Sequence, residues 1–137
     1  MQQFVIQNWY LFVALVVVLA LLAAGPISQY LHGIKAVPVA QVVRMMNHDS
    51  AIVVDVREPD EFKSGHIPDA INIPLGTLGS RLGELEKFKG RPVVVSCRTS
   101  QRSTKAAMTL RKHDFASVHV LAGGIIAWQN ENLPTRK

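Results

Sequence analysis

The chain has 137 residues, enough for a single domain, and its composition excludes several functions. The formal net charge of +5 comes from basic residues that are scattered singly, and no Lys/Arg cluster interleaved with aromatic residues indicates nucleic-acid binding. One cysteine excludes an intrachain disulfide. No group of His, Cys and carboxylate residues has the spacing of a metal site, so we expect neither a metal nor another cofactor.

The N-terminal segment is dominated by an apolar run that is unbroken from Trp9 to Ala24. The charge-free stretch from Trp9 to Ile27 would make a helix about 29 Å long, close to the thickness of the hydrocarbon core of a membrane. Gly25-Pro26 is expected to end that helix. We therefore predict a single-pass transmembrane anchor over residues 1–27. The alternative is a cleaved signal peptide, which the absence of Lys and Arg before the run disfavours.

Basic residues begin only after this segment, at Lys35 and Arg44. By the positive-inside rule, the C-terminal part is expected to face the cytoplasm. The modest excess of positive charge beside an anchor favours an anionic membrane surface as a neighbour. Residues 28–33 are predicted to be a linker, and residues 34–137 a separate domain.

Strand and helix patterns alternate after residue 34. Strands are predicted at 34–37, 51–55, 70–73, 93–95 and 117–121, and helices at 38–46, 60–63, from 78 to near 90, from 103 onward and at 125–130. This alternation predicts an α/β domain with a mostly parallel sheet that helices cover on both faces. In such sheets the chemistry lies beyond the carboxyl ends of the strands, where we place Asp55 and Cys97.

The cysteine lies between a buried valine strand and an amphipathic helix. A loop that leads into a helix N-terminus presents free backbone N–H groups and the positive end of the helix dipole. Arg98 and Arg102 flank the sulfur, so its thiolate form should be favoured. A lone cysteine is often only a small buried apolar residue, but this position favours a nucleophile. Because a cation at a helix start opposes the dipole, we expect Arg102 to help hold an anion.

Three blocks carry a resemblance to a known family. The first is Asp55-Val56-Arg57, which runs into the turn Gly65-His66-Ile67-Pro68; the second is the cysteine loop; the third is Gly123-Gly124 followed by Trp128. Together these blocks resemble a rhodanese homology domain. The resemblance covers essentially all of residues 34–134, and the layout is similar to that of membrane-anchored bacterial members with one such domain.

The resemblance implies a five-stranded sheet, a location in a bacterial inner membrane and a sulfurtransferase activity. Cys97 would carry sulfane sulfur from a small donor such as thiosulfate, as a persulfide, to a thiol or protein acceptor. With a single cysteine, the sulfur must leave to another molecule. Residues implied for the persulfide loop are Arg98, Thr99, Ser100, Gln101, Arg102 and Ser103.

Four intervening residues separate Cys97 from Arg102, which is the compact spacing of sulfur-transferring members. Related phosphatases and arsenate reductases have one residue more, so phosphatase chemistry is disfavoured. Active members commonly have glycine at the position of Ser100. If the loop needs a positive φ there, a serine would be strained by on the order of 1 kcal/mol or more. That departure supports an alternative function, a membrane-tethered binding module with little turnover and a protein partner.

The remaining matched residues have structural alternatives. Asp55 and Arg57 could touch substrate or could form a structural ion pair, and the sequence leaves both interpretations open. His66 is expected to be structural rather than a base. Gly123, Gly124 and Trp128 are expected to form a turn and part of the core, outside the site.

Overall fold

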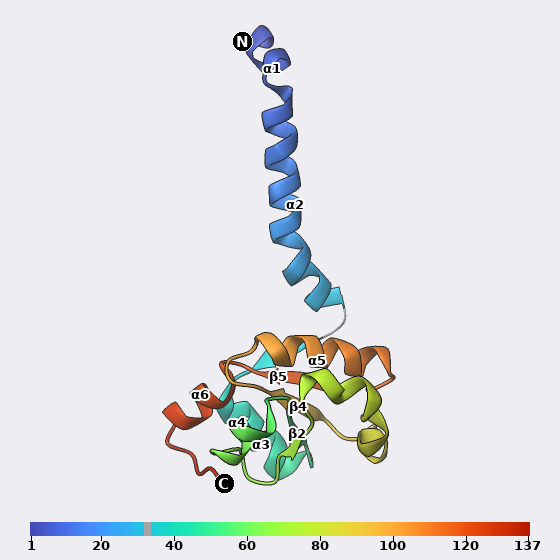
Figure 1. Cartoon of the computed structure of the whole chain (residues 1–137), viewed down its shortest axis with the longest axis vertical. Helices are drawn as coiled ribbons and strands as arrows, with labels where there is room; N and C mark the ends of the chain where they lie inside the picture. Colours follow the sequence, from blue (N-terminus) through green and yellow to red (C-terminus); the bar gives the residue numbers. More distant parts are fainter. Residues whose placement is uncertain (32–33) are drawn as a thin grey trace.

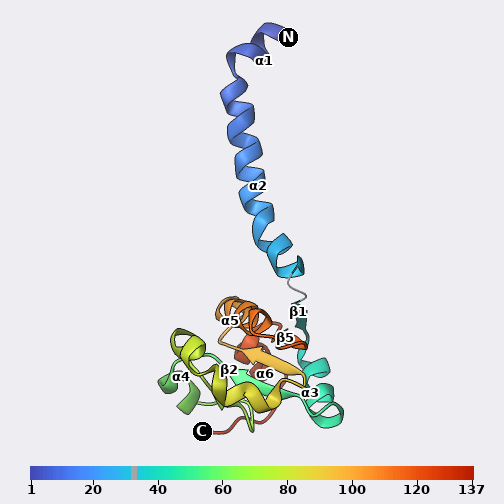
Figure 2. The same cartoon turned by 90° about the vertical axis from the view of Figure 1, so that its right-hand side faces the viewer.

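The computed structural model describes the backbone of residues 1–31 and 34–137, and the side chains of residues 1–24 and 34–137. Residues from 34 onward form one α/β domain, and a long N-terminal helix projects away from it (Figures 1 and 2). The C-terminus lies on the domain, at the side opposite to that helix.

The N-terminal segment forms α1 (Gln2–Gln7) and α2 (Trp9–Leu31). The predicted helix end at Gly25-Pro26 is wrong, because α2 continues to Leu31. The linker predicted at 28–33 is therefore helical over 28–31, and residues 32 and 33 lie outside the described residues. The predicted transmembrane anchor over residues 1–27 is also not confirmed: in the part of the chain that the structure describes, no helix combines the length and the apolar character that a membrane crossing requires.

The domain is built on five strands. Every pair in the sheet is parallel, and the spatial order β1-β5-β4-β2-β3 places β4 in the middle. This confirms the predicted parallel sheet, and no strand end differs from its predicted position by more than one residue. The strands are β1 (Lys35–Val37), β2 (Ile52–Asp55), β3 (Ile71–Asn72), β4 (Val93–Ser96) and β5 (Val118–Leu121).

Two apolar clusters cover the two faces of the sheet. Val93 and Val95 of β4 pack on the face covered by α5 (Gln101–Lys112), whereas Val94 packs on the opposite face. That opposite face is covered by α3 (Val39–His48) and α6 (Gly124–Asn130). Because a fully buried parallel strand is apolar on both faces, the valine run of β4 follows from its central place.

The segment between β3 and β4 differs from the prediction. One amphipathic α-helix was expected there, but the chain forms two 3-10 helices, η1 (Leu75–Ser80) and η2 (Leu82–Phe88). The buried leucines, Leu78 and Leu85, belong to rows of apolar residues spaced by three. A spacing of three matches the three residues per turn of a 3-10 helix, and glycines within the segment weaken an α-helix.

The carboxyl ends of the two central strands lie side by side. Asp55, the last residue of β2, is in register with Ser96, the last residue of β4. α4 (Pro59–Lys63) follows β2 shortly afterwards, and Cys97 follows β4 directly. The fold therefore brings the aspartate block and the cysteine loop to one edge of the sheet, as predicted.

Candidate active site around the cysteine loop

Cys97 is deeply placed in this loop. The residue is 1% exposed and belongs to the apolar cluster on the α5 face. Its Sγ lies 3.4 Å from the Oγ of Ser103, in the first turn of α5. A reagent must therefore approach the sulfur past the loop residues that cover it, which favours small and compact reactants.

The hydroxyl of Ser103 can form a hydrogen bond with the sulfur of Cys97 both as a thiol and as a thiolate. It donates to the backbone carbonyl of Ser100, with an Oγ–O distance of 3.0 Å. With the thiol present, the S–H group can donate to the Ser103 oxygen. With a thiolate, the hydroxyl can rotate and donate its own proton to the sulfur, since hydroxyl protons turn to suit their partners.

We expect Ser103→Ala to slow the reaction of Cys97 with a small thiol reagent by on the order of tenfold. A hydrogen bond to a charged group contributes about 1.5–3 kcal/mol, and the substitution removes that bond from the thiolate. The matched control is Thr104→Val, because the Thr104 hydroxyl donates to the same Ser100 carbonyl at 2.9 Å. Stopped-flow alkylation rates check this, and equal slowing in both variants would contradict it.

The backbone of the loop is oriented by α6. The N–H of Ile125 donates to the carbonyl of Cys97 at 2.8 Å, and that of Ile126 to the carbonyl of Arg98 at 3.3 Å. In a trans peptide the C=O and the following N–H point in opposite directions, so the N–H groups of Arg98 and Thr99 point away from α6. Within the described part of the chain, the backbone N–H groups of residues 98–103 donate to no protein acceptor. These donors are available to an anion.

Ser100 is not strained as a replacement for glycine. Its φ is −160°, outside the left-handed region that favours glycine, so the condition under which a serine would be strained here is not met. Ser100 is the N-cap residue of α5, and its side chain makes no capping hydrogen bond. Its carbonyl accepts hydrogen bonds from the backbone N–H and the hydroxyl of Thr104. The loop therefore adopts its shape without needing glycine at this position.

Arg102 is held by a protein carboxylate. Its two terminal nitrogens lie 2.7 and 3.0 Å from the two carboxylate oxygens of Glu61 in α4. The same carboxylate accepts the backbone N–H of Glu58 at 3.1 Å, which caps α4. Arg102 was expected to help hold an anion, and the anion that it contacts in the structure is the carboxylate of Glu61 in the chain itself. The pair ties α4 to the first turn of α5.

The Glu61–Arg102 pair predicts an acid-dependent part of the stability. The side-chain hydrogen bond from Arg102 is the main cause that lowers the pKa of Glu61 from 4.5 to about 2, while burial opposes it. Because the folded-state pKa is lowered, the stabilisation is complete above pH 4.5 and is lost as the pH falls towards 2. Both side chains are 34% exposed, so solvent screening limits this contribution to about 1 kcal/mol.

Glu61→Gln should therefore lower the free energy of unfolding at pH 7 and reduce its fall between pH 4.5 and 2. Urea unfolding at several pH values measures both effects. Glu131→Gln, at the exposed end of α6, is the control and should keep the wild-type acid dependence. An unchanged slope for Glu61→Gln would contradict the prediction.

Arg98, Thr99 and Gln101 form the exposed outer side of the loop. Among the described residues, the Arg98 guanidinium has no carboxylate partner within ion-pair distance. Arg98 is therefore the uncompensated cation of the loop, whereas Arg102 is neutralised. Of the two arginines that flank the cysteine, Arg98 is the one available to an anionic reactant.

Asp55 and Arg57 form a buried ion pair, the contact that the structural interpretation of these two residues describes. The Arg57 side chain contacts both Asp55 oxygens, at 2.7–3.0 Å, and its backbone N–H donates to Asp55 at 3.0 Å. Arg57 also donates to the carbonyl of Gly65 at 2.8 Å. The Asn72 amide donates to the carbonyls of both residues. The pair thus joins β2, β3 and the turn after α4.

His66 is likewise structural, as expected. Its ring stacks on that of Phe62, with 3.7 Å between the ring centres, and its Nδ1 lies 2.9 Å from the Phe62 carbonyl. Trp128 is 4% exposed and its indole N–H donates to the carbonyl of Pro134, so it belongs to the core as predicted.

Two residues contribute to the site although no role in it was predicted for them. Gly124 was assigned to a turn outside it, yet a Cβ at this position would overlap the carbonyl oxygens of the cysteine loop. Glu61 was given no role. The cation at the start of α5 was a signal that a carboxylate was needed, but 41 residues separate Arg102 from Glu61 and no local pattern connects them.

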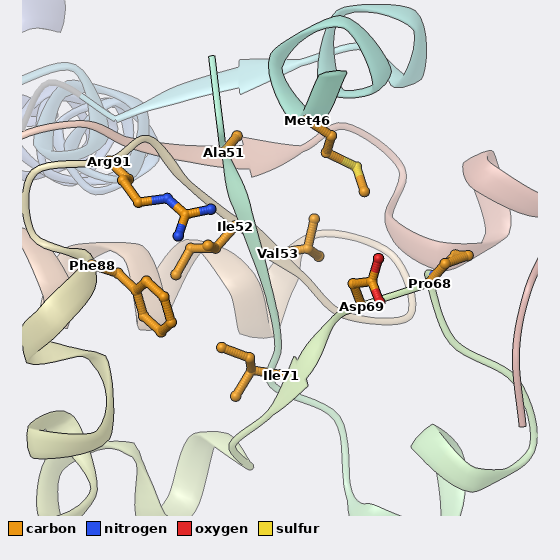
Figure 3. A pocket seen from close by; sticks show the side chains of 9 residues that line it. All are labelled: Met46, Ala51, Ile52, Val53, Pro68, Asp69, Ile71, Phe88 and Arg91. Carbon is orange, nitrogen blue, oxygen red and sulfur yellow. The ribbon is translucent and has the colours of Figure 1, made fainter. Parts of the chain in front are cut away.

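The cavities among the described residues include two of about 300 Å3 beside the sheet. One, of about 300 Å3, lies between α4 and α6 and includes Arg98 of the cysteine loop. The other, of about 320 Å3, surrounds the start of β2 (Figure 3), where Arg91 and Phe88 face Met46 and Asp69 across the strand. The second cavity contains no residue of the cysteine loop.

The fold and the site together define a class. The domain has a parallel sheet, a cysteine between β4 and α5, and after that cysteine a run of backbone N–H groups that donate to no protein acceptor among the described residues. The protein-family model described as Rhodanese-like domain matches residues 38–131 of the chain. The chain belongs to the rhodanese-like sulfurtransferase family.

Individual relatives agree with this assignment. The uncharacterized protein YibN of Escherichia coli K12 is 34% identical over 133 residues, covering 96% of this chain and 93% of the relative. The thiosulfate sulfurtransferase GlpE of Shewanella oneidensis is 35% identical over 98 residues, with coverages of 72% and 95%. A rhodanese-related crystal structure from Thermoplasma volcanium has a TM-score of 0.66 and 31% identity, with coverages of 74% and 96%.

Proposed function

We propose that this chain transfers sulfane sulfur from a small anionic donor such as thiosulfate, through a persulfide on Cys97, to a thiophilic acceptor. The observation that carries the proposal is the set of backbone N–H groups at residues 98–103 that have no protein acceptor, beside the sulfur. Such groups stabilise an anion at low reorganisation cost. The uncompensated charge of Arg98 adds attraction for an anionic donor.

In the first half-reaction the Cys97 thiolate attacks the outer sulfur of thiosulfate. A new S–S bond forms at Sγ, the S–S bond of thiosulfate breaks, and sulfite leaves with its electron pair. In the second half-reaction an acceptor nucleophile attacks the outer sulfur of the persulfide. The Sγ–S bond then breaks and returns its electron pair to Cys97, so neither an oxidant nor a reductant is consumed.

Intact-protein mass spectrometry after treatment with thiosulfate tests the first half-reaction. The wild-type chain should gain the mass of one sulfur atom, and cyanide should remove it as thiocyanate. Cys97→Ser should gain nothing. An absent adduct on folded wild-type protein would refute the proposal, and a binding module with little turnover would then be the better hypothesis.

Ser100 was the sequence feature that supported the binding module. Since this residue has an extended φ, the proposal needs no relief of strain at that position.

A further inference from the structure

The cavity between α4 and α6 reaches the cysteine loop at Arg98, the residue that follows Cys97. Its volume is about 300 Å3, at the lower end of the range of about 300–1,000 Å3 that small-molecule sites occupy. This is more space than a donor as compact as thiosulfate requires. Its lining comes from α4 and the turn that follows, from the loop and from α6.

The charges in the cavity leave one cation in excess. Arg57 is neutralised by Asp55, and Glu61 is neutralised by Arg102. Arg98 lines the same cavity without a carboxylate partner among the described residues. A ligand that carries one negative charge would therefore balance the cavity.

The wall of the cavity that α6 forms is apolar, with the side-chain amide of Gln129 at its far end. Ile125 and Ile126 of α6 supply the apolar surface, and Ile126 is 37% exposed although it is a large aliphatic side chain. Gln129 lies one turn further along α6, is exposed, and offers one acceptor and two donors. A ligand with a short aliphatic body and a carboxylate fits this combination.

We propose that this cavity binds the sulfur acceptor, and that the acceptor is a small thiol bearing a carboxylate, which Arg98 holds. The proposal rests on the proposed function, because the acceptor thiolate must reach the persulfide of Cys97. The thiolate forms a new S–S bond with the outer sulfur, the Sγ–S bond breaks, and its electron pair returns to Sγ. The thiol leaves as a persulfide. Arg98 thus selects the acceptor by charge.

The test uses the full chain, first loaded with sulfur by thiosulfate, and follows the loss of the persulfide by rapid-quench mass spectrometry. The acceptors are 3-mercaptopropionate, which has a carboxylate, and 2-mercaptoethanol, which has none. Each variant is compared with the wild type for the same acceptor, so that differences in intrinsic thiol reactivity cancel.

Arg98→Gln should lower the rate constant for 3-mercaptopropionate about three- to fivefold, the effect expected of one exposed charge pair, and should leave that for 2-mercaptoethanol within twofold. Arg98→Lys keeps the positive charge and should retain most of the rate with 3-mercaptopropionate.

Ile126→Glu, which places a negative charge on the exposed wall of the cavity, should slow the reaction with 3-mercaptopropionate and not that with 2-mercaptoethanol. Lys105→Gln, an exposed position of α5 outside the cavity, controls for lost net charge and should change neither rate. At an ionic strength of about 1 M, charges are screened within about 3 Å. Under that condition, Arg98→Gln and the wild type should react with 3-mercaptopropionate at the same rate.

Equal losses for both acceptors in Arg98→Gln would overturn the proposal, and so would no loss for either. Backbone NMR titration of the unloaded chain with 3-mercaptopropionate gives a readout that does not need turnover. Shifts at Arg98, Ile126 and Gln129 without any persulfide would support the cavity and refute the sulfur transfer. If the persulfide forms, but the two acceptors lose rate equally in Arg98→Gln and these shifts are absent, sulfur transfer is supported and binding of the acceptor in the cavity is refuted.

Discussion

Gly124→Ala is expected to unfold the domain at markedly lower denaturant concentration and to slow the persulfidation of Cys97 strongly. The residue has a φ of +60°, and an alanine Cβ there would overlap the carbonyl oxygens of Cys97, Arg98 and Thr99. A positive φ costs a non-glycine residue about 1–3 kcal/mol, and overpacking costs a similar amount. We therefore expect a loss of on the order of 3 kcal/mol or more in the free energy of unfolding.

The overlap also has a functional consequence. To relieve it, the loop must move away from α6, which breaks the hydrogen bonds from Ile125 to Cys97 and from Ile126 to Arg98. Those bonds orient the loop peptides, so the N–H groups at the sulfur would lose their alignment. Residual folded protein should then form persulfide slowly.

Gly83→Ala is the matched control, since a Cβ at Gly83 meets no atom within 4 Å and the residue has no positive φ. Urea unfolding and the mass of thiosulfate-treated protein measure the two effects. Wild-type stability together with wild-type persulfidation in Gly124→Ala would show that α6 does not shape the loop.

Arg57→Met and Asp55→Leu should each destabilise the domain strongly. Asp55 is 1% exposed and Arg57 5% exposed, so each single substitution leaves an unpaired charge inside the protein. Breaking a buried pair in this way costs about 3–5 kcal/mol. Arg57→Met also removes the hydrogen bond to the Gly65 carbonyl, which holds the turn after α4.

The double variant distinguishes pairing from simple loss of packing. Replacement of both charges by apolar residues is often close to neutral, so Asp55→Leu with Arg57→Met should lose less stability than the sum of the single variants. The exposed pair Arg81–Glu84 is the control, and Glu84→Gln should change stability little. Additive losses in the double variant would indicate that the two side chains act independently.

Local patterns were sufficient where a feature depends on neighbouring residues. The valine run before Cys97 has the composition of a strand buried on both faces, and β4 is the central strand with both faces covered. The rule that parallel strands share their carboxyl edge then placed Asp55 beside the cysteine loop, which the register with Ser96 confirms.

Local patterns gave a wrong prediction where the α-helical period of 3.6 residues and the 3-10 period of 3 residues both fit the same apolar residues. Leu78, Leu82 and Leu85 satisfy an α-helical spacing, but the chain adopts 3-10 turns with glycines between them. The end of α2 is a similar case, because a helix can continue through a Gly-Pro pair that usually interrupts one.

The amino-acid sequence by itself determined the parallel α/β architecture, the order of its strands and helices along the chain, and the position of Cys97 in the loop between β4 and α5, because each depends on residues within a few positions of one another. Only the tertiary structure decided which charges are neutralised. Arg102 is paired with a carboxylate 41 residues away and Arg98 is not. Only the fold, too, placed Gly124 against the loop carbonyls. Ion pairs and close approaches of this kind arise when distant elements dock, and their partners leave no periodicity in the chain.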